Sequence, residues 1–246
     1  MTDNRLGGDP EAERDRVAED ELGLRVAAHG EWLAAEGRAG TRFDYPGANL
    51  IYAGFLLADL RRANLSDVCL INANLRECDL TGATLDGANL QGASMVNTVL
   101  SAASLKGADL ARAIIPGVAF ENADLSAASL RSTNLLSADF SGANLPGADL
   151  TDSNLAGSKL HQACFDGCDF TDAKLMLAEF SGASLRGANF TKAVMFGALL
   201  DEADLSDADL SLALGLTAEQ LGTAYGNDGT KLPEPLSGEV LRARPA

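Results

Sequence analysis

The residues with the widest chemical repertoire in this chain are two histidines and four cysteines. His29 and His161 stand far apart, and neither lies at a spacing that would complete a catalytic or metal-binding set. Cys164 and Cys168 have the spacing of a metal pair, but the repeat described below turns one side chain outward and the other inward. The glycines recur with a period of five and form no phosphate-binding loop. We therefore expect no enzymatic activity, no metal site and no cofactor.

The carboxylates are the remaining residues that could do chemistry. The chain has 35 acidic and 19 basic residues, and its formal net charge is −16. Residues 48–117 hold 6 acids and 5 bases, whereas residues 121–212 hold 14 acids and 5 bases. Such a surface repels nucleic acid and attracts a basic groove, so we predict no direct nucleic-acid binding. The Asp spacing does not match the nonapeptide pattern of calcium-binding β-helices.

A strict period of five organises most of these residues. Every fifth residue from Leu50 to Leu210 is Leu, Phe, Met or Ile, which makes 33 consecutive matches. The residue two places before this central residue is Ala in 25 of 33 repeats, and the one just before it is Asn or Asp in 17. Gly stands two places after it in 12 repeats. Neither an α-helix nor a flat strand can turn all 33 large side chains inward.

A chain that turns the same way every five residues does bury them all. Four sides then close a square coil of 20 residues, with Gly favoured at corners where φ is positive. The tripeptides Ala48-Asn49-Leu50 and Ala58-Asp59-Leu60 resemble the pentapeptide-repeat family. That resemblance implies an all-β solenoid, a right-handed quadrilateral β-helix, over residues 44–212. About 8 coils at strand spacing make a rod about 40 Å long.

The two ends depart from the repeat. In residues 1–43 we expect a disordered leader, a helix start at Asp9-Pro10, and a helix face made by Leu22, Val26, His29 and Leu33 that ends at Gly37. This segment either covers the first coil or binds a partner. In residues 213–246 the capping box Thr217–Gln220 predicts a short helix that stops at Gly226. The C-terminal segment is either a cap or a homodimer module.

The four sides of the coil differ in character. We define face two by the pentapeptides centred on residues 55, 75, 95 and so on, and faces one, three and four by those centred on 50, 60 and 65. The net charges of faces one to four are −3, +1, −4 and −4. Face two has nine apolar residues at predicted outward positions: Leu56, Leu57, Val96, Ile114, Leu136, Met176, Leu177, Val194 and Phe196. Such a stripe is covered by a terminal segment, forms an interface with a second copy or another partner, or has no function.

The family resemblance also implies a function. Its best-understood members are acidic rods that mimic duplex DNA and bind DNA gyrase or topoisomerase IV, in some cases giving protection from antibiotics. If this chain binds in that way, we expect the site to be the acids on faces one, three and four in the C-terminal half, chiefly Asp149, Asp152, Asp169, Asp172, Asp201, Asp204, Asp207 and Asp209. The alternative is a rigid interaction scaffold that uses face two without DNA mimicry. No apolar run is long enough to span a membrane and no signal peptide is evident, so the chain is expected to be cytoplasmic.

Overall fold

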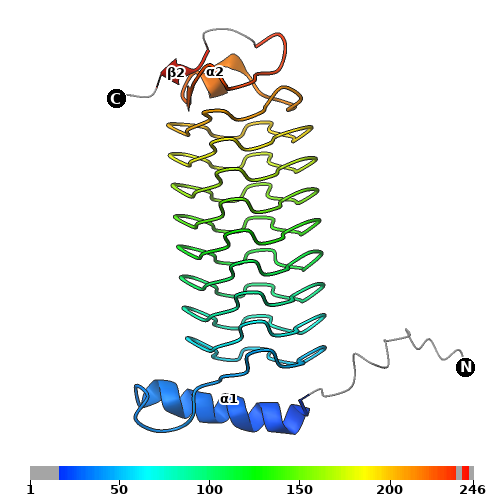
Figure 1. Cartoon of the computed structure of the whole chain (residues 1–246), viewed down its shortest axis with the longest axis vertical. Helices are drawn as coiled ribbons and strands as arrows, with labels where there is room; N and C mark the ends of the chain where they lie inside the picture. Colours follow the sequence, from blue (N-terminus) through cyan, green and yellow to red (C-terminus); the bar gives the residue numbers. More distant parts are fainter. Residues whose placement is uncertain (1–16, 237–239, 244–246) are drawn as a thin grey trace, which may run out of the picture.

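The computed structural model describes residues 17–236 and 240–243 of the chain. These residues form a rod of stacked coils, with one helix across the N-terminal end and a group of short elements at the C-terminal end (Figure 1). The helix start predicted at Asp9 and the leader before it lie outside the described residues.

Backbone hydrogen bonds between successive coils hold the rod together. Parallel bridges join residues 20 apart, from Asp44↔Asn64 to Val194↔Leu214, without interruption. Each side of a coil has a single bridging residue, because the chain turns again five residues later. The repeat therefore forms a β-helix of isolated bridges rather than long strands. This confirms the predicted period of 20 residues per coil.

Every corner is a tight turn with a left-handed residue. In one such turn the Ala53 N–H donates to the Leu50 carbonyl at 3.1 Å, and Tyr52 between them has a φ of 60°. Positive φ recurs at every fifth residue from Gly47 to Asp207. Gly accounts for 13 of these 33 corners and other residues for 20. The strain of a non-glycine residue here costs roughly 1–2 kcal/mol, which the inter-coil hydrogen bonds must offset.

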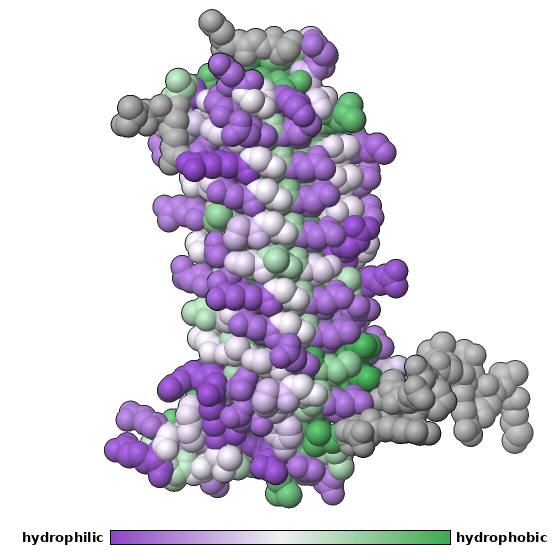
Figure 2. All heavy atoms as spheres, viewed as in Figure 1, coloured by the Kyte–Doolittle hydropathy of each residue, from purple (hydrophilic) through white to green (hydrophobic). Residues whose placement is uncertain are grey.

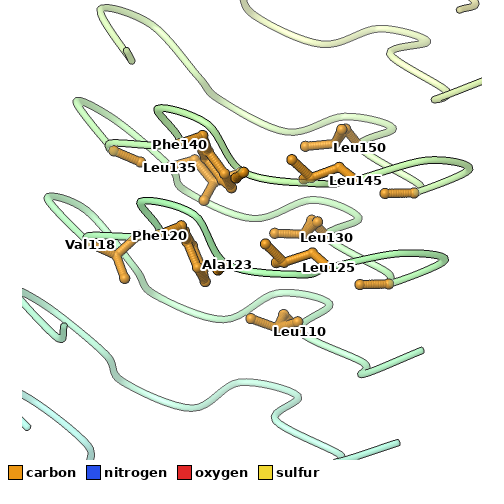
Figure 3. Packing of buried hydrophobic residues seen from close by; sticks show 14 of the residues in the cluster. Leu110, Val118, Phe120, Ala123, Leu125, Leu130, Leu135, Phe140, Leu145 and Leu150 are labelled. Carbon is orange, nitrogen blue, oxygen red and sulfur yellow. The ribbon is translucent and has the colours of Figure 1, made fainter. Parts of the chain in front are cut away.

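The core is the axis of the rod. The large residues at multiples of five are buried, as are the small residues two places before them, except that Ala48 and Ala58 in the first coil are partly buried. Successive coils place like side chains above one another, such as Leu110, Leu130 and Leu150 (Figure 3). Phe120 and Phe140 stack with ring centroids 4.8 Å apart. The predicted inward positions are thus confirmed.

Helix α1 (Glu19–Ala34) lies across the first coil (Figure 1). Ala18 is extended, and Glu19 opens the first turn of this helix. Its buried residues are Leu22 and His29, on the predicted face. The N–H of Gly37, which has a φ of 82°, closes the C-terminal end by donating to the Trp32 carbonyl.

The C-terminal segment continues the ladder of the rod. Helix α2 (Ala218–Leu221) starts with the predicted capping box, but it ends well before Gly226. The reason is that strand β1 (Tyr225–Gly226) pairs with the last coil, where Tyr225 bridges Asp204. Strand β2 (Arg242–Ala243) then adds to β1 in parallel.

Candidate interaction surfaces

The acids that precede a central residue are tied into the next turn. Asp149 Oδ1 accepts from the Thr151 N–H at 3.0 Å, and Asp169 Oδ1 accepts from the Thr171 N–H at 2.9 Å. Asn residues at this position accept in the same way, as Asn189 does from the Thr191 N–H. This bond is the physical reason for the Asn and Asp preference in the repeat. These side chains therefore hold the turns in shape.

Three of these turn-bound acids also pair with a base. Asp149, Asp204 and Asp209 lie 3.1, 2.6 and 2.8 Å from Arg131, Arg186 and Lys231, respectively. The hydrogen bond from Lys231, with that from Ser211, lowers the pKa of Asp209 to about 2. Asp204 is almost fully buried. Their charge is largely compensated by the neighbouring base.

The other four predicted acids project from the corners. Asp152, Asp172 and Asp207 occupy left-handed turn positions, and Asp201 is the first residue of its turn. All four are exposed. Asp207 Oδ1 accepts from the Asn227 amide at 3.1 Å, and none of the four has an ion-pair partner among the described residues. The eight predicted acids thus separate into four that are turned into the scaffold and four that face solvent.

Sequence reasoning omitted Glu202, an exposed corner residue next to Asp201. The register of the repeat could have found it, because the two residues after each central residue form the corner. Asp201 and Glu202 line a depression of about 300 Å³ at the C-terminal end of the rod, with Gln162 and Thr223. Arg242 also lines it, so the depression has groups of both charges.

Face two exposes a row of apolar side chains. Seven of the nine predicted residues are exposed, and Val96 and Val194 are half-buried. Leu214, which bridges Val194, is also exposed and extends the row. The interpretation that α1 or the C-terminal segment covers this stripe is wrong for the described residues. Figure 2, which shows one side of the rod, has apolar side chains scattered among hydrophilic rows.

The Cys and His residues have structural surroundings. Burial raises the pKa of the Cys78 thiol to about 11 and that of Cys168 to about 12, so both stay protonated. Cys164 is half-buried and outward. His161 Nε2 lies 2.7 Å from Glu179 Oε2 on the surface.

The described residues contain no group of three or more potential metal ligands. Among their helices, none is both long and apolar enough to cross a membrane.

Comparisons with known proteins extend these observations. The sequence model for pentapeptide repeats matches in 8 copies, over residues 47–76, 63–101, 78–115, 103–140, 133–172 and 173–213. The structure is similar to HetL, a pentapeptide repeat protein involved in heterocyst differentiation regulation in the cyanobacterium Nostoc sp. strain PCC 7120. The identity is 26%, 82% of this chain and 88% of HetL are covered, and the TM-score is 0.44. No curated protein matches the sequence.

Two further solved structures are similar. QnrB1, a plasmid-mediated fluoroquinolone resistance protein, is 18% identical over 71% of this chain and 84% of its own, with a TM-score of 0.42. A pentapeptide repeat protein of the Arabidopsis thaliana thylakoid lumen is 23% identical over 63% and 83% of the two chains, with a TM-score of 0.21.

Proposed function

Because this chain belongs to the pentapeptide-repeat family, we propose that it is a non-enzymatic binding rod that mimics duplex DNA. Its acidic C-terminal half occupies the basic groove of a type II topoisomerase, DNA gyrase or topoisomerase IV, and can thereby protect that enzyme from antibiotics that target it. The rod has about eight coils. Helix α1 covers its first coil and the segment from α2 to β2 covers its last.

The outward corner acids are the observation that carries this proposal. Asp152, Asp172, Asp201 and Asp207, together with Glu202, project from turns whose backbone is held by hydrogen bonds. Asp152 and Asp172 occupy the same corner of successive coils, which stack at about 4.8 Å. Their positions are set before binding, so association loses little conformational entropy. A basic groove shaped for phosphates would meet carboxylates that are fixed at three corners of the rod.

The turn-bound acids have a different part in the proposal. Asp149, Asp169, Asp204 and Asp209 keep the corners in shape and are secondary to binding, because hydrogen bonds and ion pairs already satisfy them. A test can therefore separate charge that faces outward from charge that is internally compensated. Two variants that remove the same number of charges make that comparison.

The test variant replaces Asp172, Asp201 and Asp207 with Asn and Glu202 with Gln. The matched control replaces four turn-bound acids with Asn, which can still accept the turn hydrogen bond. These are Asp124 and Asp139, which accept from the Ser126 and Ser141 N–H groups, together with Asp149 and Asp169. We expect wild type to inhibit DNA supercoiling by gyrase, the control to retain most of this inhibition, and the test variant to lose it. Circular dichroism checks that both fold. The proposal fails if wild type leaves supercoiling unchanged or if both variants inhibit equally.

A second candidate function rests on face two. Seven of its predicted apolar residues are exposed, which suits a scaffold that binds a protein partner without DNA mimicry. Binding through this face would tolerate salt, whereas binding through the corner acids would weaken as salt increases. The salt dependence of a captured complex therefore distinguishes the two functions.

A further inference from the structure

The sequence of residue types along face two suggests what binds to it. Residues 20 apart stack on successive coils, so each outward position forms a column along the rod. Three columns of outward residues lie on or beside this face. They are the near corner column of residues 52, 72 and onward, which ends the face-one pentapeptides, the central column of 54, 74 and onward, and the far corner column of 56, 76 and onward. We propose that two copies of this chain pair side by side and antiparallel through face two, about a two-fold axis at the level of Leu136.

The symmetry determines which residues meet. A two-fold axis that lies in the face and crosses the rod reverses the order of the coils but leaves each column opposite itself. Residues equally far above and below the axis then lie across from each other. An axis at Leu136 overlaps nine levels, from Tyr52 to Leu212.

The far corner column is apolar in both directions from this axis. Leu136 meets Leu136 of the second copy, and Val96 meets Met176. Pro116 and Ala156, which are half-buried, also lie opposite each other. The one charged residue, Arg76, meets Phe196, whose exposed ring is a favourable surface for a guanidinium.

The near corner column adds charge complementarity. Arg112 lies opposite Asp152 of the second copy, and the symmetry makes this pair twice. Both residues are exposed, and neither has an ion-pair partner among the described residues. Ser132 lies on the axis, and Asn72 meets Lys192. In the central column Ser94 meets Lys174. No two like charges are directly opposite within these three columns.

The parallel arrangement is much poorer. A two-fold axis along the rod places each near corner against the far corner of the same level. Asp172 would then lie against Met176, and Arg112 against Pro116. Burying a charge against an apolar side chain is costly, so the side chains of this face favour the antiparallel pair.

The size of the face suits a dimer of this kind. Nine levels at about 4.8 Å make it about 38 Å long, and a side of five residues is at most about 16 Å wide. The flat area is then roughly 600 Å² per copy, near the ~800 Å² per partner of a standard interface. Asp201, Glu202 and Asp207 belong to faces three and four, so dimerisation leaves them accessible. Asp152 and Asp172 lie within the interface, so only the single chain presents all five corner acids to a basic groove.

The mass of the full chain in solution tests this proposal. We expect a dimer by sedimentation equilibrium. Leu136→Glu puts two carboxylates against each other on the axis and should raise the dimer dissociation constant at least tenfold, since like-charge contact costs several kcal/mol. The matched control is Leu199→Glu, at an exposed position on face three, which should leave the dimer intact. Circular dichroism shows that both variants are folded.

A charge exchange tests the register. Arg112→Asp should weaken the dimer by placing acid against Asp152, and Arg112→Asp with Asp152→Arg should restore it. A chain that is monomeric at all soluble concentrations overturns the proposal, as does a Leu136→Glu variant that dimerises like wild type. Failure of the double variant to recover the affinity overturns the antiparallel pairing at this level.

Discussion

At the scale of single residues, the repeat tolerates a strained conformation at more than half of its corners. Twenty corner residues other than Gly have positive φ. Their side chains face solvent, so nothing but the backbone decides the cost. Ala127 is an informative case because the corners directly above and below it are Gly107 and Gly147, around which no atoms crowd an added Cβ.

Ala127→Gly should therefore stabilise the protein. Relief of the left-handed strain gains roughly 1–2 kcal/mol, and the greater freedom of Gly in the unfolded chain costs roughly 0.4–1 kcal/mol. We expect the free energy of unfolding, measured by chemical denaturation, to increase by about 0.5–1 kcal/mol. The neighbouring Ala128→Gly is the control, because Ala128 is buried and the loss of its methyl group should destabilise the protein. Equal effects of the two changes would contradict the strain argument.

At the scale of elements, one histidine joins helix α1 to the rod. His29 Nδ1 accepts from the Phe43 N–H at 2.9 Å, and Nε2 donates to the Arg61 carbonyl at 3.0 Å. The ring also stacks on Trp32. Only the neutral form, with its proton on Nε2, can make both bonds. Burial lowers the pKa of His29 below the ordinary 6.5, although Asp59 nearby acts in the opposite direction.

The docking of α1 should consequently depend on pH. The unfolded segment takes up a proton near pH 6.5 while the docked one resists it, so the stabilisation is present above that pH and is lost as pH falls below it. Fluorescence of Trp32, the only tryptophan, should report the change. His29→Gln should abolish the transition, and His161→Gln should leave it in place. A transition that persists in His29→Gln would assign it to another group.

At the scale of the whole molecule, each coil depends on its two neighbours. A solenoid has no contacts between distant parts of the chain, so damage in the middle separates two shorter rods. The core is continuous from Phe43 to Leu210, with no polar layer to divide it. A buried charge at the centre should therefore unfold the central coils and separate the two ends of the rod.

Leu145→Asp should unfold the central coils. Leu145 is fully buried, and an unpaired carboxylate there should cost more than about 4 kcal/mol. Leu199→Asp makes the same chemical change at a residue that is 48% exposed and should have little effect. Thermal unfolding followed by circular dichroism compares the two. Similar melting temperatures for both variants would show that the inward assignment of position 145 is wrong.

The sequence alone determined the coil, because the period of five is a local property. It identified the inward residues from Leu50 to Leu210, the corners and the capping box at Thr217 without any knowledge of the fold. The hydrogen bond between an Asn or Asp side chain and the turn after it is also local, because its two residues stand at fixed positions within the repeat.

Only the tertiary structure decided which acids are compensated. Asp149 pairs with Arg131 and Asp209 with Lys231, residues 18 and 22 positions away that the coil brings onto the same face. The same holds for His29, whose partner Arg61 lies 32 residues away, and for Tyr225, which extends the ladder after an irregular segment. Such contacts depend on the exact stacking of coils and on side-chain direction, and a period in the sequence specifies neither.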